Sequence, residues 1–178
     1  ILGAGTGNDV NIALRNGARD ITAVEIDPQI AAIGREFNPM RPYQDSAVRL
    51  VIDDGRHFLS NTKDRYDMVL FGTLDSQTLL AGQTNLRLDN YIYTTECFKD
   101  ARKVLEPGGM LAAYYSVFKP WFLGRIYSTV ASAFPGALQI HRLQDNYLFN
   151  TTIIAAKDVP AFASDPDCEV DLVKAGLV

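Results

Sequence analysis

The sequence predicts an α/β fold with a mostly parallel sheet, and three observations support this prediction. Apolar runs of strand length alternate with helical patterns along nearly the whole chain. Glycine or acidic residues follow directly after several of these runs. The 178 residues are enough for one domain of ordinary size with one buried core. We therefore expect right-handed crossovers and helices on both faces of the sheet, in three αβα layers.

The first predicted strand is represented only by its last residues. Ile1 and Leu2 stand directly before a glycine-rich turn and a helical pattern. Because a strand needs about five residues, we expect this strand to begin upstream of Ile1 and the sequence to be a piece of a longer chain.

Gly, Pro and capping residues set the other boundaries. Pro28 fits the first turn of a helix, and Thr94 or Thr95 suits the N-cap of a helix that Pro107–Gly109 stops. Further strands are predicted at 20–25, 48–52, 66–71, 110–116, 137–142 and 147–156, and helices at 8–16, 28–37, 56–59 and 121–134. The last two strands are close enough in sequence to be antiparallel, which gives about seven strands with a terminal hairpin.

Composition and charge limit the classes of function. With 47% hydrophobic and 21% charged residues, the chain resembles a soluble globular protein. A net charge of -4 gives no basic footprint for nucleic acid, and no apolar run reaches the ~20 residues that span a membrane. Cys97 and Cys168 have no second Cys or His at metal-ligand spacing, so we expect no metal site. We interpret His57 and His141 as structural.

Glycines at alternate positions follow the first strand. In Gly3-Ala4-Gly5-Thr6-Gly7 they allow a tight turn, so that a ligand can approach the peptide groups and the next helix N-terminus. A tight structural turn without a ligand would show the same pattern. Asn8 and Asp9 occupy the region where the dinucleotide fingerprint has its last glycine.

Acidic residues end the next two strands. Glu25 is placed to accept both hydroxyls of a ribose, and Asp54 to accept from an exocyclic amine while Gly55 leaves room for a purine. Asp53 could take the role of Asp54, or both could cap the following helix, and Glu25 could be a solvent-facing acid. Because the three loops meet at one crevice of an open parallel sheet, we predict a nucleotide site there.

Several of these segments resemble class I S-adenosylmethionine-dependent methyltransferases, and most nearly spermidine synthases. The resemblance rests on Gly3–Gly7, Val24–Pro28, Val51–Arg56, Tyr66–Leu70 and Leu105–Gly109, and it covers residues 1–157, with 158–178 as a C-terminal tail. It implies a Rossmann-like, doubly wound sheet and a ligand that is S-adenosylmethionine or decarboxylated S-adenosylmethionine. The expected ligand-binding residues are Gly3, Gly5, Thr6, Gly7, Glu25, Ile26, Asp53, Asp54, Gly55 and Gly72.

Two positions depart from the pattern of spermidine synthases. These enzymes usually carry an acid inside the glycine loop, where this chain has Thr6, and an acid directly after the fourth strand, where it has Gly72. Only Asp75, the second acid of the latter loop, is retained, so Asp75 is the candidate catalytic base. General-base assistance contributes about 10² to 10⁴ in rate. We therefore expect inefficient spermidine synthesis.

The segment from Asp75 to Tyr93 is long for a loop in a compact domain, and such loops are usually functional or disordered. One interpretation is a lid over the acceptor, with Tyr91 or Tyr93 lining an acceptor pocket. The alternative is that these aromatic residues pack the next helix onto the sheet.

Two functions remain open. The first is a transferase that moves a methyl or aminopropyl group to a small nucleophile, for example an amine; Glu25, Asp54 and Asp75 favour it. The second is a non-catalytic nucleotide-binding or regulatory domain of a larger protein, which Thr6 and Gly72 favour. A nicotinamide-dependent dehydrogenase ranks third. We expect a cytoplasmic domain, either free or attached to a membrane segment of a longer chain, without nucleic-acid or membrane contact of its own; a homodimer is an open alternative.

Overall fold

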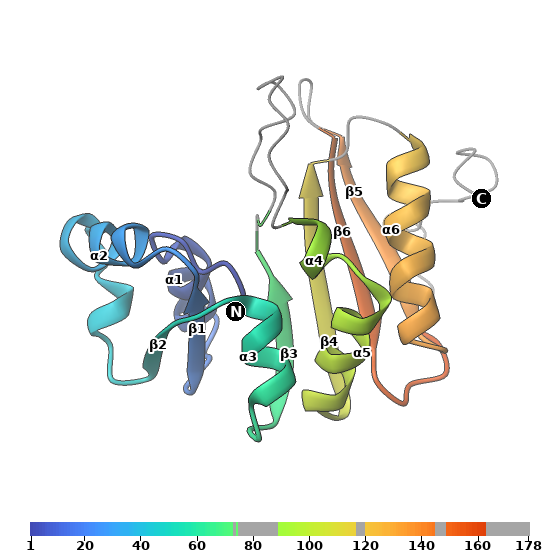
Figure 1. The fold of residues 1–178 in the computed structure, drawn as a ribbon, viewed down its shortest axis with the longest axis horizontal. Coiled ribbons are helices and arrows are strands. Elements are labelled where there is room, and N and C mark those ends of the chain that lie inside the picture. The colour runs from blue at the N-terminus through green and yellow to red at the C-terminus, as the bar shows by residue number, and fades with distance from the viewer. Residues whose placement is uncertain (73, 75–88, 117–119, 145–148, 163–178) are drawn as a thin grey trace.

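A computed structural model describes residues 1–72, 74, 89–116, 120–144 and 149–162 of the chain. Strands and helices alternate through these residues (Figure 1). The strands are β1 (Ile21–Glu25), β2 (Val48–Ile52), β3 (Tyr66–Phe71), β4 (Leu105–Ser116), β5 (Leu138–Gln144) and β6 (Phe149–Ala156). The helices are α1 (Asn8–Arg15), α2 (Pro28–Phe37), the short 3-10 helix η1 (Pro42–Gln44), α3 (Gly55–Asn61), α4 (Asp89–Ile92), α5 (Thr95–Val104) and α6 (Pro120–Ala133).

Leu2 joins two groups of strands at the centre of the fold. β1 pairs with β2, while the other four strands pair in the order β3, β4, β6, β5. Leu2 forms parallel bridges to Val24 of β1 and to Phe71 of β3. Its N–H donates to the carbonyl of Leu70 at 2.8 Å, and its carbonyl accepts from the N–H of Gly72 at 3.0 Å. The strand end expected at this position is therefore confirmed.

The C-terminal strands form the antiparallel pair that the sequence predicts. β6 lies between β4 and β5 and is antiparallel to both, with Ile153 opposite Ala113 and Ile140. β1 with β2, and β3 with β4, pair in parallel. The sheet is thus mostly parallel, with β6 as its antiparallel strand among the described residues.

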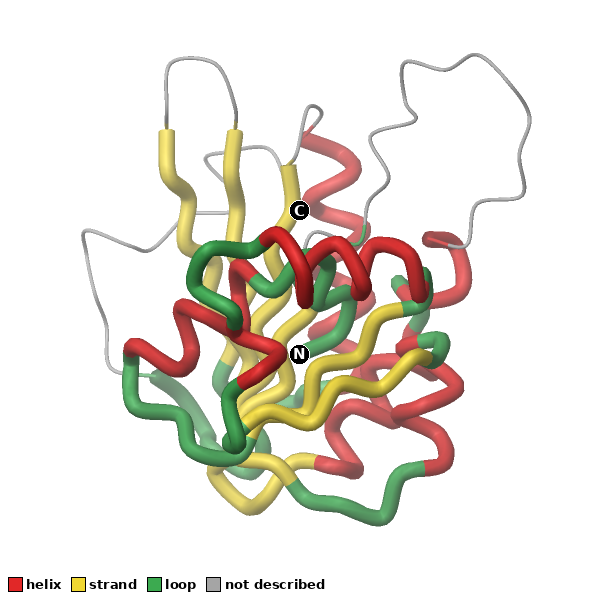
Figure 2. The backbone as a smooth tube through the Cα atoms, turned by 90° about the vertical axis from the view of Figure 1, so that its left-hand side faces the viewer, coloured by secondary structure: helices red, strands yellow, loops and turns green. Residues whose placement is uncertain are grey.

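Helices cover the two faces of the sheet unequally. α3, α5 and α6 lie along one face, where Phe71, Phe98 and Leu111 belong to the larger buried cluster (Figure 1). On the other face, α1 and η1 pack against β1 and β2; Figure 2 views the chain from the side of α2, with the strands behind it. Met68 of β3 and Met110 of β4 are 49% and 41% exposed. In the described part of the chain, the expected third layer is therefore confirmed over β1 and β2 only.

Local signals set most boundaries correctly. β2 and β3 begin and end as predicted, and α2 begins at Pro28 because Asp27 accepts from the N–H of Gln29 at 2.8 Å. Thr94 is the N-cap of α5. β4 differs from the prediction: it begins at Leu105, which pairs with Tyr66 before the Pro-Gly-Gly turn, and the register then shifts. No helix among the described residues is long and apolar enough to cross a membrane.

Candidate functional site

The predicted site residues lie at the carboxyl ends of neighbouring strands. Asp54 follows β2, Glu25 ends β1, Gly3 follows Leu2, and Gly72 follows β3. Since strands are spaced by about 4.8 Å, this row extends over about 14 Å from β2 to β3. From Leu2 the chain continues to β1 and β2 on one side of Leu2, and after β2 it crosses to β3 on the other side. Open α/β sheets bind ligands at the point where the strand order reverses in this way.

Glu25 is buried, with 6% of its surface exposed, and it holds the glycine loop. Its Oε2 accepts a hydrogen bond from the N–H of Gly5 at 2.7 Å, and its Oε1 accepts one from the N–H of Asp27 at 2.9 Å. Each carboxylate oxygen can accept two hydrogen bonds. Glu25 can therefore anchor the loop and still accept from the hydroxyls of a ligand; its anchoring role was missed in the sequence.

The glycine loop adopts a backbone that favours glycine. Gly3, Gly5 and Gly7 have φ of +68°, +56° and +93°, in the left-handed region. A Cβ at Gly3 would overlap Leu74, and one at Gly7 would lie 2.5 Å from Pro42. A Cβ at Gly5 would meet no atom within 4 Å. The open side of the loop therefore lies at Gly5, next to the carboxylate of Glu25.

Side chains from later segments hold this loop in place. The hydroxyl of Tyr43 donates to the carbonyl of Gly5 at 2.7 Å, and the Nδ2 of Asn38 donates to the carbonyl of Thr6 at 2.8 Å. α2 approaches the loop closely, because a Cβ at Gly34 would lie 2.7 Å from the Cα of Thr6. None of Tyr43, Asn38 and Gly34 was predicted to take part.

The phenol of Tyr43 stays protonated at neutral pH. Burial, and after it the negative charges of Glu25 and Asp9, together raise its pKa to about 12. Tyr43 therefore remains a hydrogen-bond donor to the loop, and the two carboxylates give this part of the crevice a negative potential.

Of the two acids after β2, Asp54 is the N-cap of α3, so the capping alternative is confirmed for Asp54 and not for Asp53. Asp54 accepts from the N–H of His57 at 2.9 Å, and Asp53 accepts from the N–H of Asp54 at 2.8 Å. The exposed His57 places its Nδ1 2.9 Å from both carboxylate oxygens of Asp53. This hydrogen bond and the charge of Asp53 raise the pKa of His57. Ile26 nearby is 47% exposed.

The positions expected to act on the acceptor are only partly placed. Asp75 and most of the proposed lid lie outside the described residues. Tyr91 is 54% exposed, whereas Tyr93 packs against the larger core cluster, as the packing alternative expects. Among the described residues, no group of three or more His, Cys, Asp or Glu could hold a metal ion.

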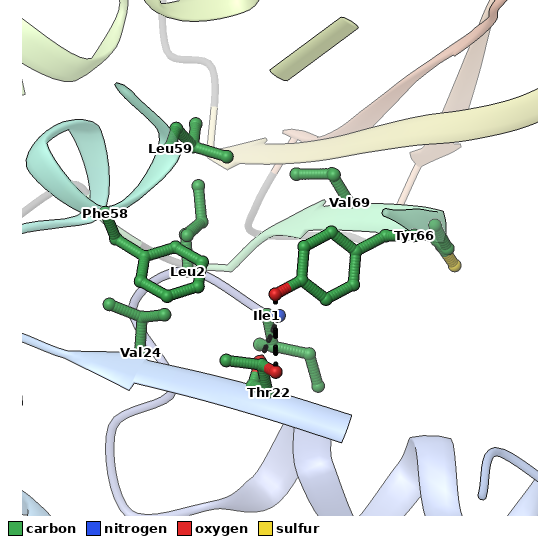
Figure 3. Close-up of a pocket in the computed structure, with 9 residues that line it drawn as sticks. Ile1, Leu2, Thr22, Val24, Phe58, Leu59, Tyr66 and Val69 are labelled. Atoms are coloured by element: carbon green, nitrogen blue, oxygen red, sulfur yellow. Dashed lines mark hydrogen bonds between the residues drawn. The ribbon is translucent and has the colours of Figure 1, made fainter. Parts of the chain in front are cut away.

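A small separate hollow lies between β1 and β3, beside Ile1 and Leu2. Figure 3 shows Phe58 and Leu59 of α3 at one side of it and the hydroxyl of Tyr66 pointing toward Thr22, 3.4 Å from its Oγ1. Its lining is mainly apolar. None of the predicted site residues lines this hollow, so it is distinct from the crevice at the strand ends.

Solved structures with the same arrangement define the class of fold. A spermidine synthase in complex with the transition-state analogue AdoDATO superposes with a TM-score of 0.66 at 15% identity, covering 98% of this chain and 54% of that one. The human methyltransferase-like protein 13 in complex with SAH gives a TM-score of 0.67 at 15% identity, covering 98% and 76%. The chain therefore has the Rossmann-like fold of class I methyltransferases.

The sequence comparison narrows this class to one family. Residues 1–132 match the spermine/spermidine synthase domain, and the chain belongs to that family. The polyamine aminopropyltransferase of Thermoplasma acidophilum is 25% identical over 115 residues, which is 64% of this chain and 39% of that protein. That of Sulfolobus acidocaldarius is 29% identical over 140 residues, 75% of this chain and 44% of that protein. The chain thus spans about two fifths of the length of these relatives.

Proposed function

We propose that this domain binds S-adenosylmethionine or its decarboxylated form and transfers a methyl or aminopropyl group to a small nucleophile, in first place an amine. The observation that carries the proposal is the pairing of Glu25 with the N–H of Gly5 at 2.7 Å, beside the open side of the loop. The same ligand class is named for two of the superposed structures, the spermidine synthase with AdoDATO and the methyltransferase with SAH.

The order of the strand ends sets the orientation in which we place the ligand. We place the ribose at Glu25 and the adenine toward β2, between Ile26, Gly55 and the acids Asp53 and Asp54. The sulfur and its arm then extend the other way, along the glycine loop toward Gly72. Within this arrangement we count Ile1–Leu2 as the seventh strand and take residues 1–157 as the ligand-binding domain, with 158–178 as its tail.

The protein does not have to activate the group that is transferred, because the sulfonium already activates it. The lone pair of the acceptor attacks the carbon attached to sulfur, the carbon–sulfur bond breaks, and the sulfur leaves as a neutral thioether. Holding the two reactants in line supplies most of the acceleration. An amine acceptor must also lose a proton, and Asp75 remains our candidate for the base.

A non-catalytic nucleotide-binding domain is the second candidate. Gly72 favours it, since this position offers no side chain to the acceptor and a Cβ there would lie 3.1 Å from the carbonyl oxygen of Gly3 and 3.2 Å from that of Leu2. Tight nucleotide binding without turnover of any amine would support this alternative.

Titration calorimetry with S-adenosylhomocysteine tests the binding proposal. Glu25→Ala should weaken binding by about 1–3 kcal/mol, because polar groups of the ribose and the loop lose their acceptor. The matched control is Glu36→Ala, which removes an exposed acid from α2 and should leave the affinity unchanged. Circular dichroism of both variants checks that they are folded. Unchanged affinity in folded Glu25→Ala, or no binding by the unmodified protein, would overturn the assignment.

A further inference from the structure

The carboxylate of Asp9 fills the space that Gly72 leaves open. Asp9 lies in the first turn of α1, and its Oδ2 is 3.0 Å from the point where a Cβ of Gly72 would stand. The carbonyl oxygens of Gly3 and Leu2 lie 3.1 Å and 3.2 Å from the same point. Asp9 is thus located over the carboxyl end of β3 and over Leu2, which lies between β1 and β3. The sequence suggested no role for Asp9.

Unlike Glu25, Asp9 has no hydrogen-bond donor for its carboxylate among the described residues. The negative charge of Asp9 also raises the pKa of Tyr43, together with burial and the charge of Glu25, so the carboxylate of Asp9 acts on this part of the crevice. A positive group is therefore favoured near this carboxylate, and no donor among the described residues occupies its oxygens.

The direction of the ligand brings one particular group to this place. With the ribose at Glu25 and the adenine toward β2, the arm on sulfur runs past Gly3 toward the end of β3. Two positive charges lie on that side of the ligand, the sulfonium and the ammonium of the aminoalkyl arm. Only the ammonium carries N–H donors for a carboxylate, and charge-assisted hydrogen bonds of this kind are strong.

We propose that Asp9 binds the ammonium group on the aminoalkyl arm of the adenosyl ligand. This inference rests on the proposed function, since it requires an adenosyl ligand in the crevice. It adds a specificity-determining residue: Asp9 would distinguish ligands with a charged arm from those that end in a neutral alkyl group.

A series of three ligands tests this role. S-adenosylhomocysteine and decarboxylated S-adenosylmethionine carry the ammonium, whereas 5′-methylthioadenosine has the same nucleoside without it. Asp9→Asn keeps the size of the side chain and removes its charge. We expect calorimetry to show affinities for the first two ligands reduced by about 10- to 100-fold, and an affinity for methylthioadenosine changed by less than about twofold. The control is Glu96→Gln, which removes an exposed first-turn acid from α5.

The outcomes separate this inference from the proposed function. Equal loss for all three ligands would show that Asp9 only shapes the crevice, and no loss for any of them would show that the ammonium lies elsewhere; either result overturns the role of Asp9 while nucleotide binding stands. If Asp9→Asn instead raises only the KM for an amine acceptor, the carboxylate serves the acceptor and the inference is wrong. Failure of the unmodified protein to bind any of the three ligands would overturn both proposals.

Discussion

The N–H of Gly5 donates to the carboxylate of Glu25 at 2.7 Å, which ties the open point of the glycine loop to the end of β1. One buried acid therefore positions the loop and faces the side from which a ligand can enter. The arrangement makes Gly5 sensitive to substitution for two separable reasons, its backbone conformation and its place beside the crevice.

Gly5→Ala and Gly17→Ala separate these reasons. Both glycines have positive φ, +56° and +90°, and a Cβ at either would meet no atom within 4 Å. Each alanine should therefore lower the free energy of unfolding by about 1–2 kcal/mol, the cost of a left-handed backbone. Only Gly5→Ala should also weaken binding of S-adenosylhomocysteine. Urea denaturation and calorimetry measure the two effects, and equal affinity in both variants would contradict the position of the ligand.

Gly34→Ala should reverse the usual effect of alanine in a helix. This change normally stabilises a helix by about 0.5–1 kcal/mol. At Gly34 the new Cβ would lie 2.7 Å from the Cα and the carbonyl oxygen of Thr6, so the helix and the glycine loop must separate. We expect a lower free energy of unfolding, by about 1–3 kcal/mol. A stabilised variant would show that α2 does not pack on the loop as described.

The pair of Asp53 and His57 predicts a pH dependence. Asp53 raises the pKa of His57 above 6.5, its ordinary value. The pair therefore contributes stability that is fully present below the unfolded pKa and is lost as the pH rises through the folded pKa. NMR titration should give a raised pKa for His57, which Asp53→Asn should return toward 6.5. The signal of His141 serves as the reference. A pKa of His57 that is unchanged by Asp53→Asn would contradict the interaction between Asp53 and His57.

Local signals in the sequence were sufficient for most of the fold. Asp27 and Pro28 mark the start of α2, and Thr94 caps α5, because capping depends on residues within one turn. Strand-helix alternation also predicted the row of strand ends at the crevice. Among the described residues no helix covers the second face of β3 and β4, and this could not be predicted from local patterns, since it depends on which helices reach that face.

Long-range contacts in the site could not be predicted from local patterns. Tyr43 reaches Gly5 across 38 residues of sequence, and Asn38 reaches Thr6 across 32. A tyrosine after a helix has no spacing that marks it as the support of a distant loop. The approach of Asp9 to Gly72 is of the same kind, because it exists only once α1 and β3 are packed at the same strand end.

Spermidine synthesis should be inefficient in this protein. Gly72 supplies no carboxylate to the attacking amine, and general-base assistance contributes about 10² to 10⁴ in rate. Thr6 cannot pair with the ammonium of the ligand as a carboxylate in the glycine loop would. We expect little product from decarboxylated S-adenosylmethionine and putrescine, measured on the full-length protein. Robust turnover would contradict this expectation, and Asp75→Asn would then show whether Asp75 is the base by removing activity and leaving nucleotide binding intact.

A crystal structure of the protein with S-adenosylhomocysteine would show whether the ligand binds at the row of strand ends. We expect the ribose hydroxyls within hydrogen-bond distance of Glu25, the adenine toward Asp54, and the arm passing Gly5 toward Gly72. A ligand seated in the hollow between β1 and β3, or one that leaves Glu25 bonded only to Gly5 and Asp27, would contradict this placement.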